Sequence, residues 1–304
     1  MTAPVINIAA SIQARLKNEA ERQARPFAEV LQYYVMERFL YRLSKTKYAA
    51  KFILKGGLLF YVWNIPLRRA TRDIDFRGYV ANDHEALLEI FKDIVEVPAP
   101  EDGITFDAES IFVEETQIDA DYQGMRAKLT ALLGRSRIPV QIDVGFSDEL
   151  ASKAESVEYP NILPDLEQVH MKGYPKESVV AEKFHAMTRH AELNSRMKDY
   201  YDLWLISETF EFEGPALQKA IEITFKNRDT ELTIERPIGL SLEFASSNQT
   251  SWSNFLKKMD LENARSDDFG KVIKKVWAFL QHPLKTAINK TKSTHTWLPS
   301  KGWK

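Results

Sequence analysis

The chain has 304 residues, of which 44% are hydrophobic and 28% are charged, and both shares are close to those of soluble globular proteins. It contains no cysteine, which excludes disulfides, thiolate zinc sites, iron–sulfur clusters and a cysteine nucleophile. No apolar run is long enough to cross a membrane and the polar start does not resemble a signal peptide, so we expect a cytoplasmic protein.

The net charge of −2 is unevenly distributed along the sequence. Residues 269–304 contain eight lysines and no acidic residue, whereas residues 1–268 contain 33 basic and 43 acidic side chains. A basic end of this kind indicates a polyanionic partner or simply a solvated segment that aids solubility. The sequence leaves both interpretations open.

The first half of the chain is predicted to begin with helices and to continue with short strands. Apolar residues near a period of 3.6 predict two helices within the first 45 residues, interrupted at Pro26. The elements predicted next are a strand or helix end at 49–55, a break at Gly56-Gly57, a helix at 58–63, a strand at 71–79, a helix at 83–95 capped by Asn82 or Asp83, and strands at 111–118 and 139–146.

The second half is predicted to be largely helical, over residues 178–225, 252–259 and 271–280. Strands followed by helices predict an α+β or α/β core that carries a helical C-terminal half. The domains expected from this pattern are a helical segment at 1–46, a core at 47–150 and a helical domain with the basic tail at 151–304.

The most informative stretch is Asp73-Ile74-Asp75-Phe76. Successive side chains of a strand point to opposite faces, so the two aspartates share one face and the two apolar residues the other. The carboxylates would lie about 7 Å apart along the strand and would repel each other unless a cation lies between them. The alternative is an exposed pair on an edge strand, which needs no cation.

Two further features favour a site for a metal and a phosphate. Asp143 lies in a stretch with the same alternation, and a third carboxylate on a neighbouring strand would complete an oxygen-rich site for Mg²⁺. Metals held in this way activate an attacking hydroxyl and stabilise the oxygen that leaves phosphorus. Gly56 and Gly57 stand before a helix, where backbone N–H groups can hold phosphate oxygens.

The order of these motifs resembles the nucleotidyltransferases of the AbiEii/AbiGii toxin family. The stretches that carry the resemblance are Lys55-Gly56-Gly57, Arg69-x-Thr71-x-Asp73-x-Asp75-Phe76, and residues 181–187 and 196–203, with looser matches at 224–228 and 252–256. Together they cover roughly residues 50–260.

The resemblance implies a polymerase-β-like nucleotidyltransferase core in which an NTP gives up its nucleoside monophosphate and releases pyrophosphate. Carried over by position, the metal ligands are Asp73, Asp75 and Asp143. The other catalytic residues implied are Lys183, which meets the triphosphate, and Asp199, and the nucleotide contacts implied are Gly56, Gly57, Thr71, Lys183 and Arg196. Leu58 departs from the family, which often has Ser or Thr after the glycine pair.

The function implied by the resemblance is that of a Mg²⁺-dependent toxin of a toxin–antitoxin system that modifies an RNA, with the tRNA 3′ end as the favoured acceptor and an antitoxin encoded nearby. Two alternatives stay open: a nucleotidyltransferase that modifies a protein or a small molecule, and a degenerate nucleotide-binding module, which Leu58 keeps open. A metal-dependent nuclease is less favoured because that chemistry requires neither the glycine pair nor Lys183.

Lys183 and Asp199 are sixteen residues apart, so on one straight helix they would point about 160° away from each other. We therefore predict a break at Asn194-Ser195, which would let two helix ends converge. The alternatives are a surface role for Lys183 and an i, i+3 salt-bridged helix face for Arg196, Asp199 and Asp202. For the neighbouring His185 we expect a structural role.

Overall fold

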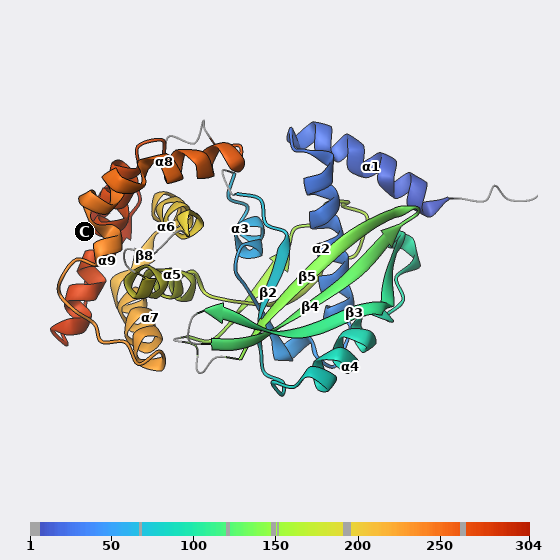
Figure 1. Ribbon diagram of the computed structural model, residues 1–304, viewed down its shortest axis with the longest axis horizontal. Helices are drawn as coiled ribbons and strands as arrows, with labels where there is room; N and C mark the ends of the chain where they lie inside the picture. The colour runs from blue at the N-terminus through green and yellow to red at the C-terminus, as the bar shows by residue number, and fades with distance from the viewer. Residues whose placement is uncertain are drawn as a thin grey trace, which may run out of the picture. The chain divides into compact units, whose positions relative to one another are not determined.

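The computed structural model describes residues 7–66, 69–119, 122–146, 150, 152–190, 196–261 and 266–304 (Figure 1). The chain divides into two compact units. The first, which we call the sheet unit, comprises Met1–Asn64, Ala70–Ser147 and Glu155–Gly173, and the second, the helical unit, comprises Ile65–Arg69, Asp148–Ala154 and Tyr174–Lys304.

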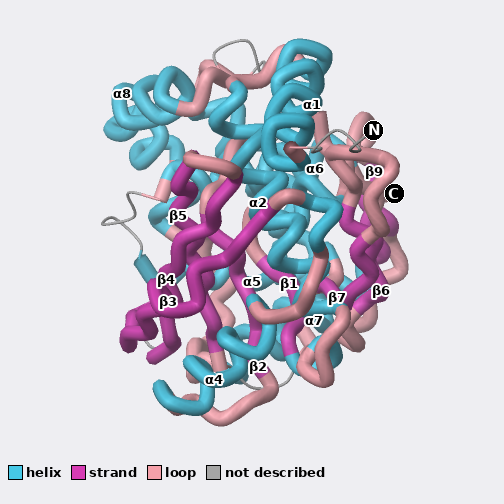
Figure 2. Tube along the Cα trace, turned by 90° about the vertical axis from the view of Figure 1, so that its right-hand side faces the viewer, coloured by secondary structure: helices cyan, strands magenta, loops and turns pink. Residues whose placement is uncertain are grey.

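The sheet unit is built on a seven-stranded sheet with the strand order β3-β4-β5-β2-β1-β7-β6. The strands are β1 (Phe52–Lys55), β2 (Asp73–Gly78), β3 (Ile104–Asp119), β4 (Tyr122–Leu133), β5 (Ser136–Gly145), β6 (Glu155–Tyr159) and β7 (Val169–Gly173). The pairs β2–β5 and β1–β7 are parallel and the others are antiparallel. Figure 2 shows β3, β4 and β5 running side by side as magenta tubes. The mixed sheet confirms the mixed α and β class.

The helices of this unit begin and end close to the predicted positions. They are α1 (Ile8–Gln23), α2 (Phe27–Ser44), α3 (Leu58–Val62) and α4 (His84–Val95), with single turns of 3₁₀ helix at η1 (Ala49–Lys51) and η2 (Pro100–Asp102). Pro26 separates α1 from α2, and the Asp83 side chain caps α4 by accepting a hydrogen bond from the N–H of Ala86. The break at Pro26 and the cap at Asp83 are thus confirmed.

Strand β4 is the largest departure from the expected elements. No strand is predicted over residues 122–133, yet β4 pairs with both β3 and β5 along most of its length. Its buried residues Ala127, Leu129 and Ala131 alternate with polar ones, as in a half-buried strand. The period of two is masked because Ala, Leu, Lys and Arg are all strong helix formers.

Helices α2 and α4 pack on one face of the sheet (Figure 1). The core between them is a chain of phenylalanine rings with centroid separations of 5.4–6.2 Å, formed by Phe39, Phe52, Phe76, Phe91 and Phe106. Ile74 and Phe76 of β2 are fully buried on this face. The alternation of β2 therefore directs Asp73 and Asp75 to the opposite face of the sheet.

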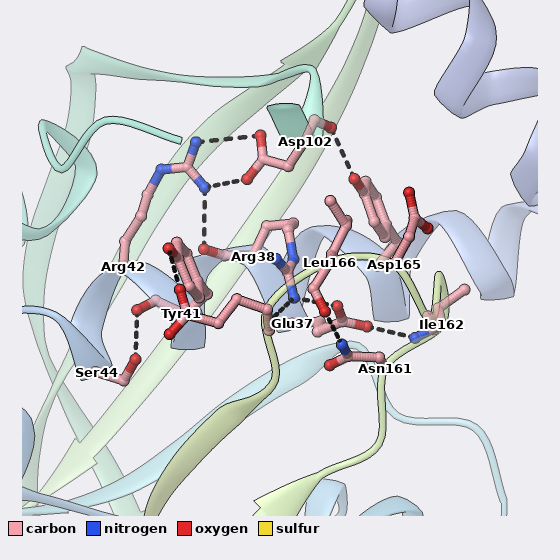
Figure 3. A network of polar contacts seen from close by, with 12 residues as sticks. Glu37, Arg38, Tyr41, Arg42, Ser44, Asp102, Asn161, Ile162, Asp165 and Leu166 are labelled. Atoms are coloured by element: carbon pink, nitrogen blue, oxygen red, sulfur yellow. Dashed lines mark hydrogen bonds and ion pairs between the residues drawn. The ribbon is translucent and has the colours of Figure 1, made fainter. Parts of the chain in front are cut away.

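A buried network of hydrogen bonds and ion pairs connects α2 to the start of β3 (Figure 3). Arg42 donates to the carboxylate of Asp102 at 2.7 Å and to the carbonyl of Ile104 at 3.0 Å. The hydroxyl of Tyr34 donates to the carbonyl of Asp102 at 2.7 Å. Because Asp102 is completely buried, its charge depends on Arg42 for compensation.

The same helix carries the buried carboxyl of Glu37, which pairs with Arg38 and accepts a hydrogen bond from the N–H of Ile162 at 2.8 Å (Figure 3). Burial raises the pKa of Glu37 to about 7, and the charge of Arg38 and the bond from Ile162 oppose this only in part.

A pH-dependent loss of stability is expected from Glu37. Between pH 4.5 and 7 the folded carboxyl keeps a proton that the unfolded one loses, so the free energy of unfolding falls as the pH rises, by roughly 3 kcal/mol in total from this group. Urea unfolding across this range should show the fall in the wild type and a flatter profile in Glu37→Gln. Equal slopes in the two proteins would contradict the assignment.

The helical unit contains α5 (Lys176–His190), α6 (Met197–Thr209), α7 (Gly214–Asn227), η4 (Ile238–Leu240), α8 (Leu242–Lys258) and α9 (Phe269–Ile288). A small sheet of three short strands, which is not predicted from the sequence, completes it: β8 (Phe212–Glu213), β9 (Thr296–Leu298) and β10 (Gly302–Trp303). Among the described residues, no helix is both long and apolar enough to span a bilayer.

Trp297 of the basic tail belongs to the core of the helical unit. Its side chain is buried, its indole N–H donates to the carbonyl of Ser207 at 2.8 Å, and its ring packs against Phe279 and Trp303. This residue therefore packs internally and does not offer a surface for stacking on bases.

Candidate active site

A row of charged residues crosses four neighbouring strands of the sheet in register. Asp75 of β2 lies directly opposite Asp143 of the parallel strand β5 and opposite Lys55 of β1. Asp143 in turn lies opposite Arg126 of β4. Residues directly opposite each other on paired strands share a face, so two acidic side chains lie between two basic ones. Asp73 is on the same face, two residues before Asp75.

Arg126 holds the carboxylate of Asp143 with two hydrogen bonds, from Nε at 2.7 Å and from Nη2 at 2.9 Å. These bonds raise the pKa of Arg126, and the charges of Asp143, Asp73 and Glu114 add to the rise. Arg126 is a residue that the sequence prediction missed. The alternation of buried and polar residues along β4 could have identified this segment as a strand. A strand paired with β5 must place one of its residues opposite Asp143, and that residue is Arg126.

The glycine pair is packed directly against the predicted site residues. Gly56 has φ of +68°, and a Cβ placed there would lie 1.9 Å from Oδ2 of Asp75. A Cβ at Gly57 would lie 2.9 Å from Oγ1 of Thr71. Only residues without side chains allow Asp75 and Thr71 to approach the turn before α3 so closely. Four predicted residues, Gly56, Gly57, Thr71 and Asp75, are thus brought together.

Gly56→Ala should cost more than backbone strain alone. The left-handed backbone costs a residue with a Cβ about 1 kcal/mol, and here the added methyl would also displace the Asp75 carboxylate. Gly134→Ala is the matched control, since Gly134 has φ of +60° but only an ordinary contact at 3.6 Å. We expect both variants to lose stability in thermal melts and only Gly56→Ala to lose the nucleotide transfer that the family resemblance implies. Equal transfer by both would contradict this role for Gly56.

Leu58, the residue that departs from the family pattern, is fully buried in the sheet unit. Its side chain packs in the core and presents no hydroxyl to a ligand at the turn. The N–H groups of Leu59 and Phe60 are bonded to the carbonyls of Gly56 and Gly57, each at 3.3 Å.

The donor set suits a cation that shares its coordination with a substrate. Within the described ranges, no group of three or more acidic or histidine side chains is arranged to hold a metal ion. Asp73 and Asp75 supply two carboxylates on one strand, and Mg²⁺ is often bound by one or two carboxylates together with substrate phosphates. Asp143 is engaged by Arg126. Asp73 and Asp75 are therefore the side chains that could supply oxygen ligands to a cation beside the turn.

The helical unit contains a second charged cluster, centred on Lys183 of α5. Its ammonium lies 2.7 Å from Oδ1 of Asp199 and 2.8 Å from Oδ2 of Asp202, both on α6. Arg69 makes two bonds of 3.0 Å to Asp202, and Arg196 lies 3.5 Å from Asp199. These five residues come from three separate segments of this unit: the stretch Ile65–Arg69, α5, and α6 with the residue before it.

The cluster is largely removed from solvent. The side chain of Lys183 is 13% exposed, and those of Asp199 and Asp202 are 6% and 1% exposed. Burial alone would lower the pKa of Lys183, but the charges of Asp199 and Asp202 outweigh it and raise that pKa. Burial likewise opposes ionisation of Asp199, yet Lys183 and Arg196 lower its pKa overall. Lys183 and Asp199 are therefore both charged at neutral pH.

The predicted convergence of Lys183 and Asp199 is confirmed, since they lie on two helices and are in contact. Residues Asn194-Ser195, where the break is predicted, lie outside the described residues. A surface role for Lys183 is wrong, because its side chain is mostly buried. The i, i+3 pairing holds for Arg196 with Asp199, whereas Asp202 binds Lys183 and Arg69 instead.

His185 has the structural surroundings expected of it. Its ring is 2% exposed, with Nε2 at 2.8 Å from the hydroxyl of Thr230 and Nδ1 at 3.1 Å from Arg228. Arg228 also approaches Glu182 at 3.9 Å. These contacts tie α5 to the end of α7 and to the loop after it.

Comparison with known proteins places the chain in a family. The family model described as nucleotidyl transferase AbiEii toxin, type IV toxin–antitoxin system, matches residues 38–281. The chain therefore belongs to the AbiEii family of nucleotidyltransferase toxins, and a type IV system implies an antitoxin as its partner. The matched residues include both charged clusters.

Two solved structures from Helicobacter pylori are similar to the chain. One is of a protein assigned as a nucleotidyltransferase, with 15% identity and a TM-score of 0.48, covering 87% of this chain and 98% of that one. The other is JHP933, with 15% identity and a TM-score of 0.49, covering 86% of this chain and 94% of that one. The comparison with curated proteins gives no match.

Proposed function

We propose that the protein transfers a nucleoside monophosphate from a Mg²⁺-bound NTP to an RNA acceptor in the cytoplasm, with the tRNA 3′ end as the favoured acceptor. The observation that carries the proposal is the contact of the Asp73/Asp75 strand with the Gly56-Gly57 turn in a member of a nucleotidyltransferase family. A pair of carboxylates beside a turn without side chains suits a metal-bound triphosphate, because both the ion and the phosphate oxygens need close approach.

Each residue near the turn has a role in this proposal. Asp73 and Asp75 would hold Mg²⁺, which neutralises triphosphate charge and favours ionisation of the acceptor hydroxyl. The N–H groups of Gly57 and Leu58, which precede the bonded N–H groups of α3, donate to phosphate oxygens, and the Thr71 hydroxyl assists. Positioning and charge neutralisation account for most of the rate enhancement in such a reaction.

Asp143 is proposed as the third carboxylate, and Arg126 sets its availability. Both oxygens of Asp143 accept hydrogen bonds from Arg126. The carboxylate would therefore bind a metal ion only weakly until the guanidinium moves to another anion. A triphosphate is an anion of that kind. In this proposal Arg126 exchanges Asp143 for a phosphate when the nucleotide binds.

Lys183 and Arg196 are proposed to meet the triphosphate, with Asp199 holding Lys183 in place. Support comes from the family match, which covers residues 38–281 and so includes Lys183, Arg196 and Asp199 as well as the Asp73/Asp75 strand.

The test is transfer of label from each of the four α-³²P NTPs in turn, with Mg²⁺, to total RNA or to total protein. We expect label in RNA, concentrated in the tRNA fraction and removed by trimming the 3′ end. Label in protein would favour the alternative of protein modification. Nucleotide binding without pyrophosphate release would favour a degenerate binding module.

A further inference from the structure

The helical unit contains a cavity of about 740 Å³ between α7 and the segment that follows α9. Four lysines line it, all exposed and all outside the clusters described above: Lys219, Lys226, Lys290 and Lys292. Among the described residues of the lining, Glu222 is the one that is acidic. We call this feature the lysine groove. It has an excess of positive charge in a chain whose net charge is −2.

The walls of the groove are fixed by Gln218 of α7. Its amide N–H₂ donates to the carbonyl of Thr291 at 3.0 Å, and its carbonyl accepts from the N–H of Ser293 at 3.1 Å. The same amide donates to Glu222 at 3.0 Å. The segment that carries two of the lysines is thus attached to α7, and the acidic side chain is engaged by a neutral partner.

The lysines of the groove have no acidic partner in the described part of the chain, unlike Lys271 and Lys275 of α9. Lys275 pairs with Glu208 at 2.6 Å and Lys271 with Asp268 at 3.7 Å. Across the part of the chain that the structure describes, none of the four groove lysines forms an ion pair. Four like charges around one cavity repel each other, so an anionic ligand would relieve this repulsion.

Lys290 occupies a backbone position that favours glycine. It has φ of +51°, and the N–H of the following Thr291 bonds to the carbonyl of Thr286 as α9 ends. Glycine is the usual residue at such a left-handed helix end, and a residue with a Cβ costs about 1 kcal/mol there. Replacing Lys290 by glycine would therefore remove a charge of the groove and relieve the backbone at the same position.

The floor of the groove adjoins the helix that carries Lys183. Phe225, which lines the groove, packs against the rings of Phe184 and His185 at 5.3 and 5.1 Å. Thr230, also in the lining, lies 2.8 Å from His185. The lysine groove therefore borders α5, the helix that also carries Lys183.

We propose that the lysine groove binds the phosphodiester backbone of the RNA acceptor; the identity of this ligand rests on the proposed function. Phosphate contacts are the chemistry that surface lysines offer to a nucleic acid, and they are independent of sequence. Within the described lining, the groove offers no exposed aromatic surface for bases, because the aromatic residue there, Phe225, is 2% exposed. The groove would thus position the acceptor without reading its sequence.

The experiment is fluorescence anisotropy with a labelled single-stranded RNA, using the full chain without NTP at several salt concentrations. We expect Lys290→Gly to weaken binding several-fold and to keep or raise the melting temperature, because glycine suits that backbone position. The double variant Lys219→Gln/Lys226→Gln should weaken binding further. Each lysine removed should reduce the salt slope of log K by about 0.7.

The matched control is Lys257→Gln/Lys258→Gln, two exposed lysines of α8 outside the groove. It removes the same charge as the double groove variant and should bind RNA nearly as the wild type does. Groove variants that bind RNA as tightly as this control would overturn the proposal. Tighter wild-type binding to poly-glutamate than to RNA would also overturn it, since the groove would then be a docking surface for an acidic protein.

The two proposals fail separately in this design. RNA binding that depends on the groove, in a wild-type protein that transfers no nucleotide, would leave the groove assigned and reject the proposed function. Groove variants that bind RNA as the wild type does and still transfer nucleotide to it would leave the proposed function standing and reject the role of the groove. Asp75→Asn should retain RNA binding, because Asp75 lies in the sheet unit and is not part of the groove.

Discussion

Asp75→Asn is expected to abolish nucleotide transfer in a protein that stays folded. Asparagine keeps the size of the side chain and its packing beside Gly56, but it loses the charge that would hold a cation. Metal-bound charge stabilisation is worth several kcal/mol, so we expect transfer to fall by roughly a thousand-fold or more. Incorporation of α-labelled NTP measures the loss, and a thermal melt measures folding.

Asp73→Asn should behave in the same way, because Asp73 shares the strand and the face with Asp75. Asp107→Asn on β3 is the control, since this aspartate lies on the same sheet but outside the charged row. It should transfer nucleotide at the wild-type rate. Full activity in both Asp73→Asn and Asp75→Asn would refute the assignment of the metal-binding strand.

Lys183→Met is expected to have the largest effect on stability. The substitution leaves Asp199 and Asp202 buried without their shared ammonium, and the removal of one partner from a buried pair costs about 3–5 kcal/mol. Arg69 and Arg196 reduce the cost, because each still contacts one of the carboxylates. Urea unfolding at neutral pH measures the change.

A double variant separates stability from activity. Adding Asp199→Asn to Lys183→Met removes one uncompensated charge and should recover part of the free energy of unfolding. Nucleotide transfer should stay low in the double variant, because the lysine that meets the triphosphate is still missing. Recovery of transfer together with stability would show that Lys183 acts only as a structural residue.

The Lys183 cluster also makes the free energy of unfolding depend on pH. The lowered pKa of Asp199 contributes stability above the ordinary aspartate pKa, and this is lost as the pH falls through the folded value. The raised pKa of Lys183 contributes stability below the ordinary lysine pKa, and this is lost as the pH rises through the folded value. The cluster is therefore most stabilising across the range between the two, which includes neutral pH.

Local patterns in the sequence were sufficient for the features that depend on neighbouring residues. The alternation of residues 73–76 predicted which side chains are buried, and Asp83 was recognised as a cap. The sixteen-residue separation of Lys183 and Asp199 required two helices, as observed. In each case the feature depends on the spacing of side chains along one strand or helix, or on the residue at the end of a helix.

Pairings between distant segments were not predictable in the same way. Arg126 was missed because β4 has the composition of a helix, and its role depends on register with β5. The contact of Arg69 with Asp202 joins residues 133 positions apart, and no local signal specifies it. The lysine groove likewise combines residues of α7 with residues that follow α9. These features arise from tertiary packing.

The arrangement Lys55, Asp75, Asp143, Arg126 has a consequence for how the protein matures. The sheet contains its own counterions, so its acidic face does not need a divalent ion while the chain folds. A chelator present during refolding should leave the yield of folded protein unchanged. Folding of the sheet unit and the binding of any metal would then be separate events.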